Sequence, residues 1–183
     1  MTSQVSGSNP IDATKQVEVV ADPYVQALNI IDSIHEMVHL GKHFVHSAED
    51  TVANGANLDH LLVTGGAAAH LRISEIDITS APFKIYLFEG TTVSANGTQQ
   101  AAVNNNRLST NTSNTQIYSG PTVTAPGTQL RYKLIPGTRQ TGGDGTTYFN
   151  EWVLKPNTNY LVRITNASGT SATVGSTLEW YEP

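Results

Sequence analysis

The chain of 183 residues contains no cysteine, and only 14% of its residues are charged. The absence of cysteine excludes a disulfide framework and catalysis by a thiolate. The net charge of -5 argues against a nucleic-acid-binding surface, which would carry clustered Lys and Arg. No window is apolar over the length of a membrane span, and the polar segment 1–7 does not resemble a signal peptide. We therefore expect neither a membrane nor a nucleic-acid partner, and a fold stabilised by packing or by packing together with a partner.

The motif with the most chemical content is H-E-x-x-H, formed by His35, Glu36 and His39. On a helix, this spacing places two imidazoles on one face as zinc ligands, with the glutamate as general base. The longer form of the motif needs glycine at position 42 and histidine at position 45, where the chain has Lys42 and Val45. We therefore favour a His-rich β-ribbon over residues 35–46, and expect no catalytic, cofactor or metal site. A zinc-dependent hydrolase is kept as a remote alternative.

From Lys42 onward, short segments of alternating apolar and polar residues are separated by turn residues, which is typical of β-proteins. Four sets of residues are each expected to share one face of a strand: Phe83/Ile85/Leu87, Leu130/Tyr132/Leu134, Tyr160/Val162/Ile164 and Leu178/Trp180. The expected strands are 42–47, 58–64, 67–78, 83–89, 129–135, 147–155, 159–166 and 172–181. About eight strands with no long helix between them predict an all-β protein, an antiparallel β-sandwich of jelly-roll type.

Two regions follow from this pattern. Residues 1–33 hold too few apolar side chains for a core of their own, and we expect an N-terminal arm that is extended or contains a short helix. Residues 34–183 are expected to form the β-sandwich domain. The arm would order against the domain or against another molecule.

The longest interruption of the strand pattern is 90–128, in which Arg107 is the one charged residue. It is bracketed by a local repeat, because Thr-Val-Ser-Ala-Asn-Gly-Thr-Gln at 92–99 resembles Thr-Val-Thr-Ala-Pro-Gly-Thr-Gln at 122–129. The favoured interpretation is two similar turns, each with glycine in a strained position, leading into strands. A loop of this length is also often functional, and its amide and hydroxyl groups suit contact with a neighbouring subunit.

Other residues were weighed as candidate sites. Glu151, Glu179 and Asp144 are carboxylates of the kind that hydrolyse glycosides in pairs, but nothing in the sequence brings two of them together. His60 and His70 lie in strand-like segments and are interpreted as polar-face or partly buried histidines with satisfied hydrogen bonds. A sugar-stacking platform could use four aromatic residues, for which packing in the core and on the sheets is favoured: Tyr148, Trp152, Trp180 and Tyr181.

Several sequence blocks together resemble a family of tailed-bacteriophage virion proteins. They are H-E-M-V-H-L-G-K-H-F at 35–44, N-L-D-H-L-L-V at 57–63, I-Y-L-F-E-G at 85–90, T-V-S-A-N-G at 92–97, N-N-N-R at 104–107, E-W-V-L-K-P-N-T-N-Y-L-V-R-I-T-N at 151–166 and L-E-W-Y-E at 178–182. The resemblance runs from about Ile34 to the end of the chain, and the block 151–166 is its most specific part. Such proteins look like head decoration (cement) proteins.

The resemblance implies a jelly-roll-like sandwich on the capsid exterior of the virion, made in the bacterial cytoplasm. Its partners would be the major capsid protein and further copies of itself, as homotrimers at threefold or quasi-threefold axes. We expect residues 1–33 to attach to the capsid and residues 90–128 to contact neighbouring subunits. A virion module that binds a host receptor or carbohydrate is the alternative. A further hypothesis gathers four histidines around an adventitious metal on the threefold axis: His35, His39, His43 and His46.

Overall fold

The computed structural model describes residues 33–80, 82–136 and 151–183. The predicted arm 1–33 therefore lies outside the described residues, apart from its last residue. The chain divides into two units, Met1–Glu36 and Met37–Pro183, and the second unit contains every described strand.

The described chain begins with α1, a helix of seven residues at Ser33–His39. The strand favoured over residues 35–46 is thus wrong for its first half, and β1 begins only at His43. A left-handed glycine explains the boundary. Gly41 has a φ of 65°, its N–H donates to the Val38 carbonyl at 3.0 Å, and that of Lys42 donates to the Met37 carbonyl at 2.9 Å. These bonds cap the helix, which places the following residues in a strand.

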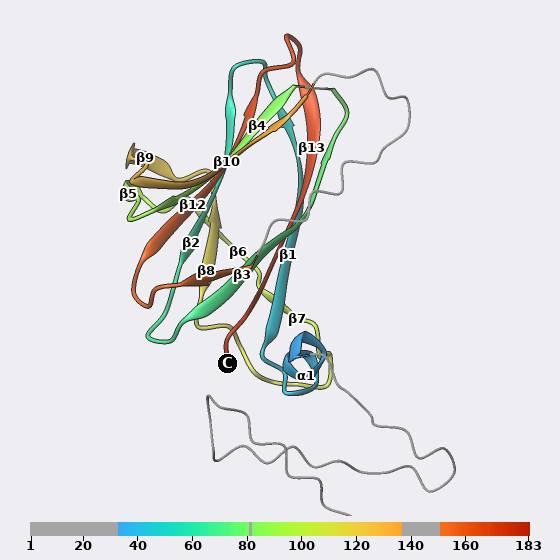
Figure 1. Cartoon of the computed structure of the whole chain (residues 1–183), viewed down its shortest axis with the longest axis vertical. Coiled ribbons are helices and arrows are strands. Elements are labelled where there is room, and N and C mark those ends of the chain that lie inside the picture. The colour runs from blue at the N-terminus through green and yellow to red at the C-terminus, as the bar shows by residue number, and fades with distance from the viewer. Residues whose placement is uncertain (1–32, 81, 137–150) are drawn as a thin grey trace, which may run out of the picture. The chain divides into compact units, whose positions relative to one another are not determined.

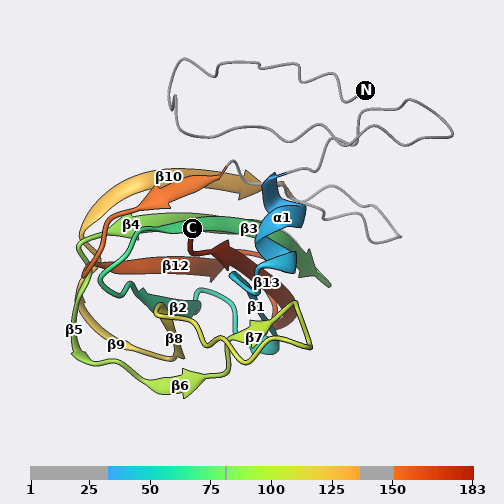
Figure 2. The ribbon, with the colours of Figure 1, turned by 90° about the horizontal axis from the view of Figure 1, so that it is seen from below.

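Two antiparallel sheets face each other across the core, as Figures 1 and 2 show. The five-stranded sheet has the order β11 (Trp152–Leu154), β3 (Ala69–Ile78), β13 (Ala172–Tyr181), β1 (His43–Val52), β7 (Val103–Asn104). The six-stranded sheet has the order β10 (Thr128–Ile135), β4 (Phe83–Glu89), β12 (Asn159–Asn166), β2 (Asn57–Val63), β8 (Gln116–Ser119), β6 (Thr98–Gln100). The predicted all-β sandwich is confirmed.

The eight strands expected from the sequence are all present among the described residues, and their pairing is nested. The first pairs with the eighth, the second with the seventh, the third with the sixth and the fourth with the fifth. The chain therefore resembles one long hairpin whose two arms cross back and forth between the sheets. Residues 147–150 of the sixth expected strand lie outside the described part.

Alternating apolar residues of both sheets fill the core. Trp180 of β13 is fully buried and stacks on Phe44 of β1, with ring centroids 6.2 Å apart. The predicted inward faces of β4, β12 and β13 are confirmed, because their members are at most 1% exposed: Phe83, Ile85, Leu87, Tyr160, Val162, Ile164, Leu178 and Trp180. Burial of each large apolar side chain contributes roughly 1.5–3 kcal/mol, so this layer dominates the stability.

The prediction that Leu130, Tyr132 and Leu134 share one face of β10 is wrong. The register against β4 jumps between Gln129 and Arg131, which makes Leu130 the extra residue of a β-bulge. Leu130 packs against the core, whereas Tyr132 and Leu134 are 46% and 45% exposed. A bulge reverses the faces of the residues that follow it, and alternation alone does not reveal it.

Candidate functional site

The interval 90–128 contains five short strands rather than an open loop. Besides β6, β7 and β8, it forms β5 (Thr92–Ala95) and β9 (Thr122–Ala125), which pair as a two-stranded ribbon. The two copies of the sequence repeat thus bind each other, with Val93 opposite Val123. Figures 1 and 2 show this β5–β9 ribbon on the side of the six-stranded sheet that faces away from the five-stranded one.

The ribbon and the strands beside it follow a local twofold symmetry. Gly97 and Gly127 have φ angles of 90° and 88°, and a Cβ at either would overlap a carbonyl oxygen, of Ser119 or Glu89 respectively. The predicted pair of glycine turns that lead into strands is confirmed.

The symmetry continues into the sheet below the ribbon. One row of residues on neighbouring strands crosses the outer face of this sheet, in the order Gln129, Phe88, Leu161, Leu61, Tyr118, Gln99. The two halves of the row are equivalent, because each runs from a glutamine through an aromatic residue to a central leucine. Leu161 and Leu61 alternate away from the main core, yet both are 0% exposed. The β5–β9 ribbon lies on that side of the sheet.

The predicted carboxylate Glu151 lies beside β11, where it meets His70 of β3. The His70 Nδ1 and Glu151 Oε1 atoms are 2.9 Å apart, and the His70 ring stacks on Tyr181 with centroids 4.5 Å apart. Burial raises the pKa of the Glu151 carboxyl, but the hydrogen bonds from His70 and Tyr181 together have a larger, opposite effect. The pKa of Glu151 is therefore below its usual range. The expected hydrogen bonding of His70 is confirmed.

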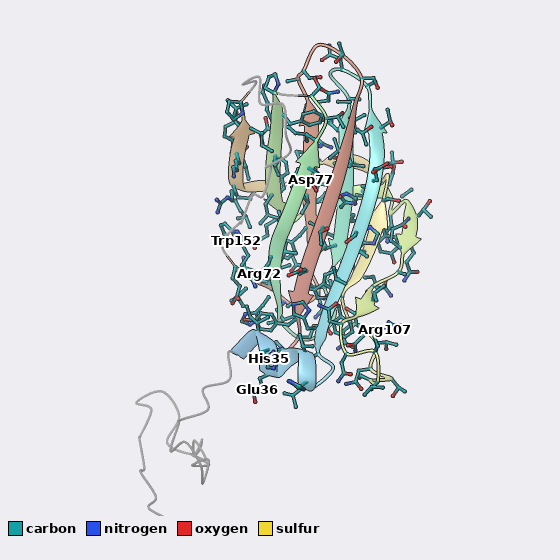
Figure 3. All side chains as sticks on the ribbon, turned by 90° about the vertical axis from the view of Figure 1, so that its right-hand side faces the viewer. His35, Glu36, Arg72, Asp77, Arg107 and Trp152 are labelled. Carbon is teal, nitrogen blue, oxygen red and sulfur yellow. The ribbon has the colours of Figure 1, made fainter. Side chains whose placement is uncertain are left out.

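The second predicted carboxylate, Glu179 of β13, lies on the same outer face of the five-stranded sheet. It is opposite Arg72, which is labelled in Figure 3, and its Oε2 is 4.0 Å from the Nε2 of buried His43. Burial lowers the pKa of His43, and the nearby Glu179 only partly opposes this. Asn105 Nδ2 is 2.8 Å from the other ring nitrogen of His43 and can donate to it.

Glu151 is not suited to the role of general acid in glycoside hydrolysis. A glycosidase needs one carboxyl held protonated at neutral pH as general acid. Glu151 has the opposite character, because its lowered pKa keeps it an anion paired with His70. The third predicted carboxylate, Asp144, lies outside the described residues. The polar residues on the outer face of the five-stranded sheet are suited to holding β3, β11 and β13 together.

The aromatic residues proposed as a sugar platform are mainly packing residues, as expected. Trp180 is 0% exposed and Tyr181 is 8% exposed, while Trp152 packs against the core cluster. Tyr148 lies outside the described residues. A different aromatic group does reach the surface, because Tyr86 and Tyr132 face outward on β4 and β10. Sequence reasoning missed it, since only the bulge turns Tyr132 outward.

Two histidines meet inside the sandwich. His46 of β1 and His60 of β2 are 7% and 0% exposed, with ring centroids 5.9 Å apart at an angle of 68°. His60 Nε2 is 3.0 Å from the Ser176 hydroxyl, and His46 Nδ1 is 3.3 Å from the Ala101 carbonyl oxygen. The remaining ring nitrogens, His46 Nε2 and His60 Nδ1, have no hydrogen-bond partner among the described residues. Burial, with a smaller effect of His46, lowers the pKa of His60 to about 4.

A buried carboxylate closes the C-terminal end of the domain. Glu182 is 7% exposed, and its two oxygens accept four hydrogen bonds of 2.8–3.1 Å from Ser113, Asn114 and Thr115. Burial raises the pKa of this carboxyl, but these donors outweigh burial and lower it. A hollow of about 530 Å³ lies beside it, lined by loop residues 110–112 and Gly41 among others. Because both carboxylate oxygens already accept hydrogen bonds, Glu182 serves to hold residues 113–115 against the C-terminus of the chain.

The H-E-x-x-H residues His35, Glu36 and His39 are exposed on α1, and Figure 3 labels the first two. Within the described ranges, no group of three His, Cys, Asp or Glu side chains is placed to hold a metal ion. The threefold-axis metal hypothesis is wrong for His43 and His46, because both side chains are buried in the domain and so cannot face a symmetry axis at its surface.

In the described part of the chain, no helix has the length and apolarity needed to cross a membrane. Comparison with protein-family models, with curated proteins and with solved structures finds no match to this chain.

Proposed function

We propose that the protein is a structural component of a bacteriophage virion. It binds the outer surface of the capsid and stabilises the shell by bridging subunits of the major capsid protein, as a trimer at threefold or quasi-threefold axes. The support comes from the resemblance of several sequence blocks to head decoration proteins, from the β-sandwich, and from the surface that residues 90–128 build.

We also infer that the sandwich is a jelly roll. A jelly roll places eight strands in two sheets through two Greek keys. The nested pairing of first with eighth, second with seventh, third with sixth and fourth with fifth strands is what results when a long hairpin is rolled into a sandwich. The additional short strands all come from one insertion, between β4 and β10.

The observation that carries the proposal is the β5–β9 ribbon. Its exposed side chains are uncharged, four with hydroxyl groups and two alanines, and Thr92 Oγ1 lies 3.0 Å from Thr124 Oγ1 across the two strands. The backbone below is fixed by Gly97, Gly127 and the buried leucines. A rigid surface of hydroxyl and amide groups suits the polar, hydrated contacts that join subunits without an obligate apolar interface. Because it is already ordered, binding costs little conformational entropy there.

The loop that follows β7, at the edge of the five-stranded sheet, forms a second surface rich in amide groups, with Arg107 as its one charged residue. Asn104 Nδ2 donates to the carbonyl oxygens of Gly41 and Asn111, at 2.9 and 3.1 Å. Asn106 Nδ2 donates to the His39 carbonyl at 2.9 Å. These bonds fix the loop and leave Leu108 96% exposed at its tip. An isolated apolar side chain held out in this way is the kind of anchor that fills a pocket on a partner.

The predicted arm, residues 1–33, would add attachment to the shell. A segment that orders only on binding spans a large surface, at a cost of roughly 1–2 kcal/mol per residue fixed. Trimerisation offsets this cost, because one bound arm raises the effective concentration of the other two.

The test is co-sedimentation with matching capsids that lack the protein, comparing the full chain with a chain that begins at Ile34. We expect saturable binding of the full chain at the stoichiometry of threefold sites, and loss of binding when the arm is removed. Equal binding of both chains would move the attachment to the sandwich and its ribbon. Absence of binding by either chain would contradict the capsid role.

A further inference from the structure

A row of aromatic rings crosses the outer face of β4 and β10, in which Tyr86 and Phe88 are half-buried and Tyr132 is exposed. The rings of Tyr86 and Phe88 stack at 19° with centroids 5.6 Å apart, and Tyr132 lies 5.2 Å from Tyr86. Tyr132 is 46% exposed, and Leu134 beside it is 45% exposed. The chain thus presents the side chains of Tyr132 and Leu134 to solvent on β10, an edge strand of the six-stranded sheet.

The exposure of this surface is built into the backbone. Without the bulge at Leu130, Tyr132 and Leu134 would alternate toward the core, as the sequence pattern predicts. The bulge keeps Leu130 packed inside and turns the next two apolar residues out. Bulges of this kind are common where a strand re-aims a side chain for function.

Charged groups continue the row on the next two strands. Tyr132 is opposite Tyr86, Tyr86 is opposite Arg163 on β12, and Arg163 is opposite Asp59 on β2. Arg163 donates to both Asp59 oxygens, from Nε at 2.7 Å and from a terminal nitrogen at 2.6 Å. Strands lie about 4.8 Å apart, so the row measures about 14 Å from Tyr132 to Asp59. Two rings therefore stand beside a planar ion pair whose orientation is fixed.

A protein partner does not suit this row by itself. A stable protein–protein interface needs about 20–30 residues on each side, whereas the large apolar side chains exposed on the described part of this sheet face are those of Tyr132 and Leu134. A small amphipathic ligand does suit it. A pyranose ring has one apolar C–H face, which packs on an aromatic ring, and a rim of hydroxyl groups, which bond to oriented polar groups.

We propose that the row of Tyr132, Tyr86, Arg163 and Asp59 is a binding site for a saccharide chain. The first sugar rings stack on the two tyrosines, and the hydroxyl groups of the next unit bond to the Arg163–Asp59 pair. Phe88 supports Tyr86 from the side nearer the β5–β9 ribbon. The site goes beyond the proposed capsid role and does not depend on it, since it uses a different part of the surface.

The test uses the full chain and three soluble hexasaccharides: cellohexaose, maltohexaose and hexagalacturonate. Saturation-transfer NMR followed by a titration should reveal binding of at least one, with a dissociation constant of about 1 mM or lower. Tyr132→Ser should weaken that binding about tenfold or more. Tyr118→Ser is the matched control, because Tyr118 is a tyrosine on the same outer face at β8, outside the row. The Tyr118→Ser variant should bind the saccharide with the same dissociation constant as the unaltered protein.

Three results would overturn the proposal: no binding of any probe, binding unaffected by Tyr132→Ser, or equal loss in both variants. If Tyr132→Ser does not fold, backbone amide shifts in the unaltered protein decide the matter. Ligand-induced shifts should then centre on Tyr86, Tyr132 and Arg163, and shifts confined to other residues would contradict the assignment. The saccharide test does not involve capsids, so a failure of the capsid proposal would leave the saccharide titration unchanged. The two proposals can therefore fail independently.

Discussion

The carbonyl oxygen of Ser119 lies where the side chain of any larger residue at position 97 would begin, so Gly97 is the residue that lets β6 turn against β8. The second copy of the repeat uses the same contact, between the Glu89 carbonyl and Gly127. Both glycines have φ near 90°, where other residues are strained. The ribbon proposed to face neighbouring subunits therefore depends on two equivalent backbone contacts.

Gly97→Ala should destabilise the domain by about 2 kcal/mol or more, because strain at positive φ adds to overlap with the Ser119 carbonyl. Gly120→Ala is the matched control. Gly120 also has a positive φ, of 63°, but a Cβ there would meet nothing within 4 Å. Its expected cost is about 1 kcal/mol. Urea unfolding followed by tryptophan fluorescence measures both, and equal losses would contradict the importance of the contact.

Stability should fall as the pH is lowered from 6.5 to 4, because His60 remains neutral in the folded protein. Its folded pKa is about 4, whereas an unfolded histidine titrates near 6.5. Between these values the unfolded chain binds the proton more readily, so protonation favours unfolding. The loss amounts to about 3 kcal/mol and is complete below pH 4. His46 and His43, whose pKa values are also lowered, add to the same trend.

His60→Gln isolates this effect, because glutamine retains polar atoms near Ser176 but does not titrate. The variant should show a shallower dependence of unfolding free energy on pH between 6.5 and 4. An unchanged slope would mean that His60 is not the titrating group. NMR titration of the imidazole in the unaltered protein checks the pKa independently.

Glu182→Gln should cost about 2–3 kcal/mol, because an amide group then faces N–H donors that now bond to a carboxylate. The folded pKa of Glu182 is lowered, so its contribution is present above the unfolded value near 4.5 and disappears as the pH falls through the folded value. Glu49→Gln is the control, since Glu49 is exposed on β1. Equal urea midpoints for the two variants would show that the hydrogen bonds of Glu182 contribute nothing to the stability of the domain.

Alternation of apolar residues was enough to predict the eight main strands, because each buries one face over several residues. It failed at β10, where one extra residue at Leu130 reverses the pattern without any change in composition. It also failed at residues 35–39, which lie in a helix of seven residues whose C-terminal cap depends on Gly41.

The candidate sites were harder to predict than the strands. β5 to β9 contain two to four residues each, too few for a periodic signal, although the repeat around Gly97 and Gly127 did indicate related turns. The pairing of Glu151 with His70, of Glu182 with 113–115 and of His46 with His60 joins residues far apart in the chain. Such contacts follow from strand order and register, which a single sequence does not specify.

A protein that strengthens a capsid, as proposed, should raise the temperature at which DNA-filled capsids release their DNA. This temperature is measured with and without the protein bound at saturation. We expect a clear rise in the release temperature on binding, and a smaller rise for capsids carrying the Gly97→Ala protein. Saturated capsids that release their DNA at the same temperature as bare ones would contradict the capsid proposal.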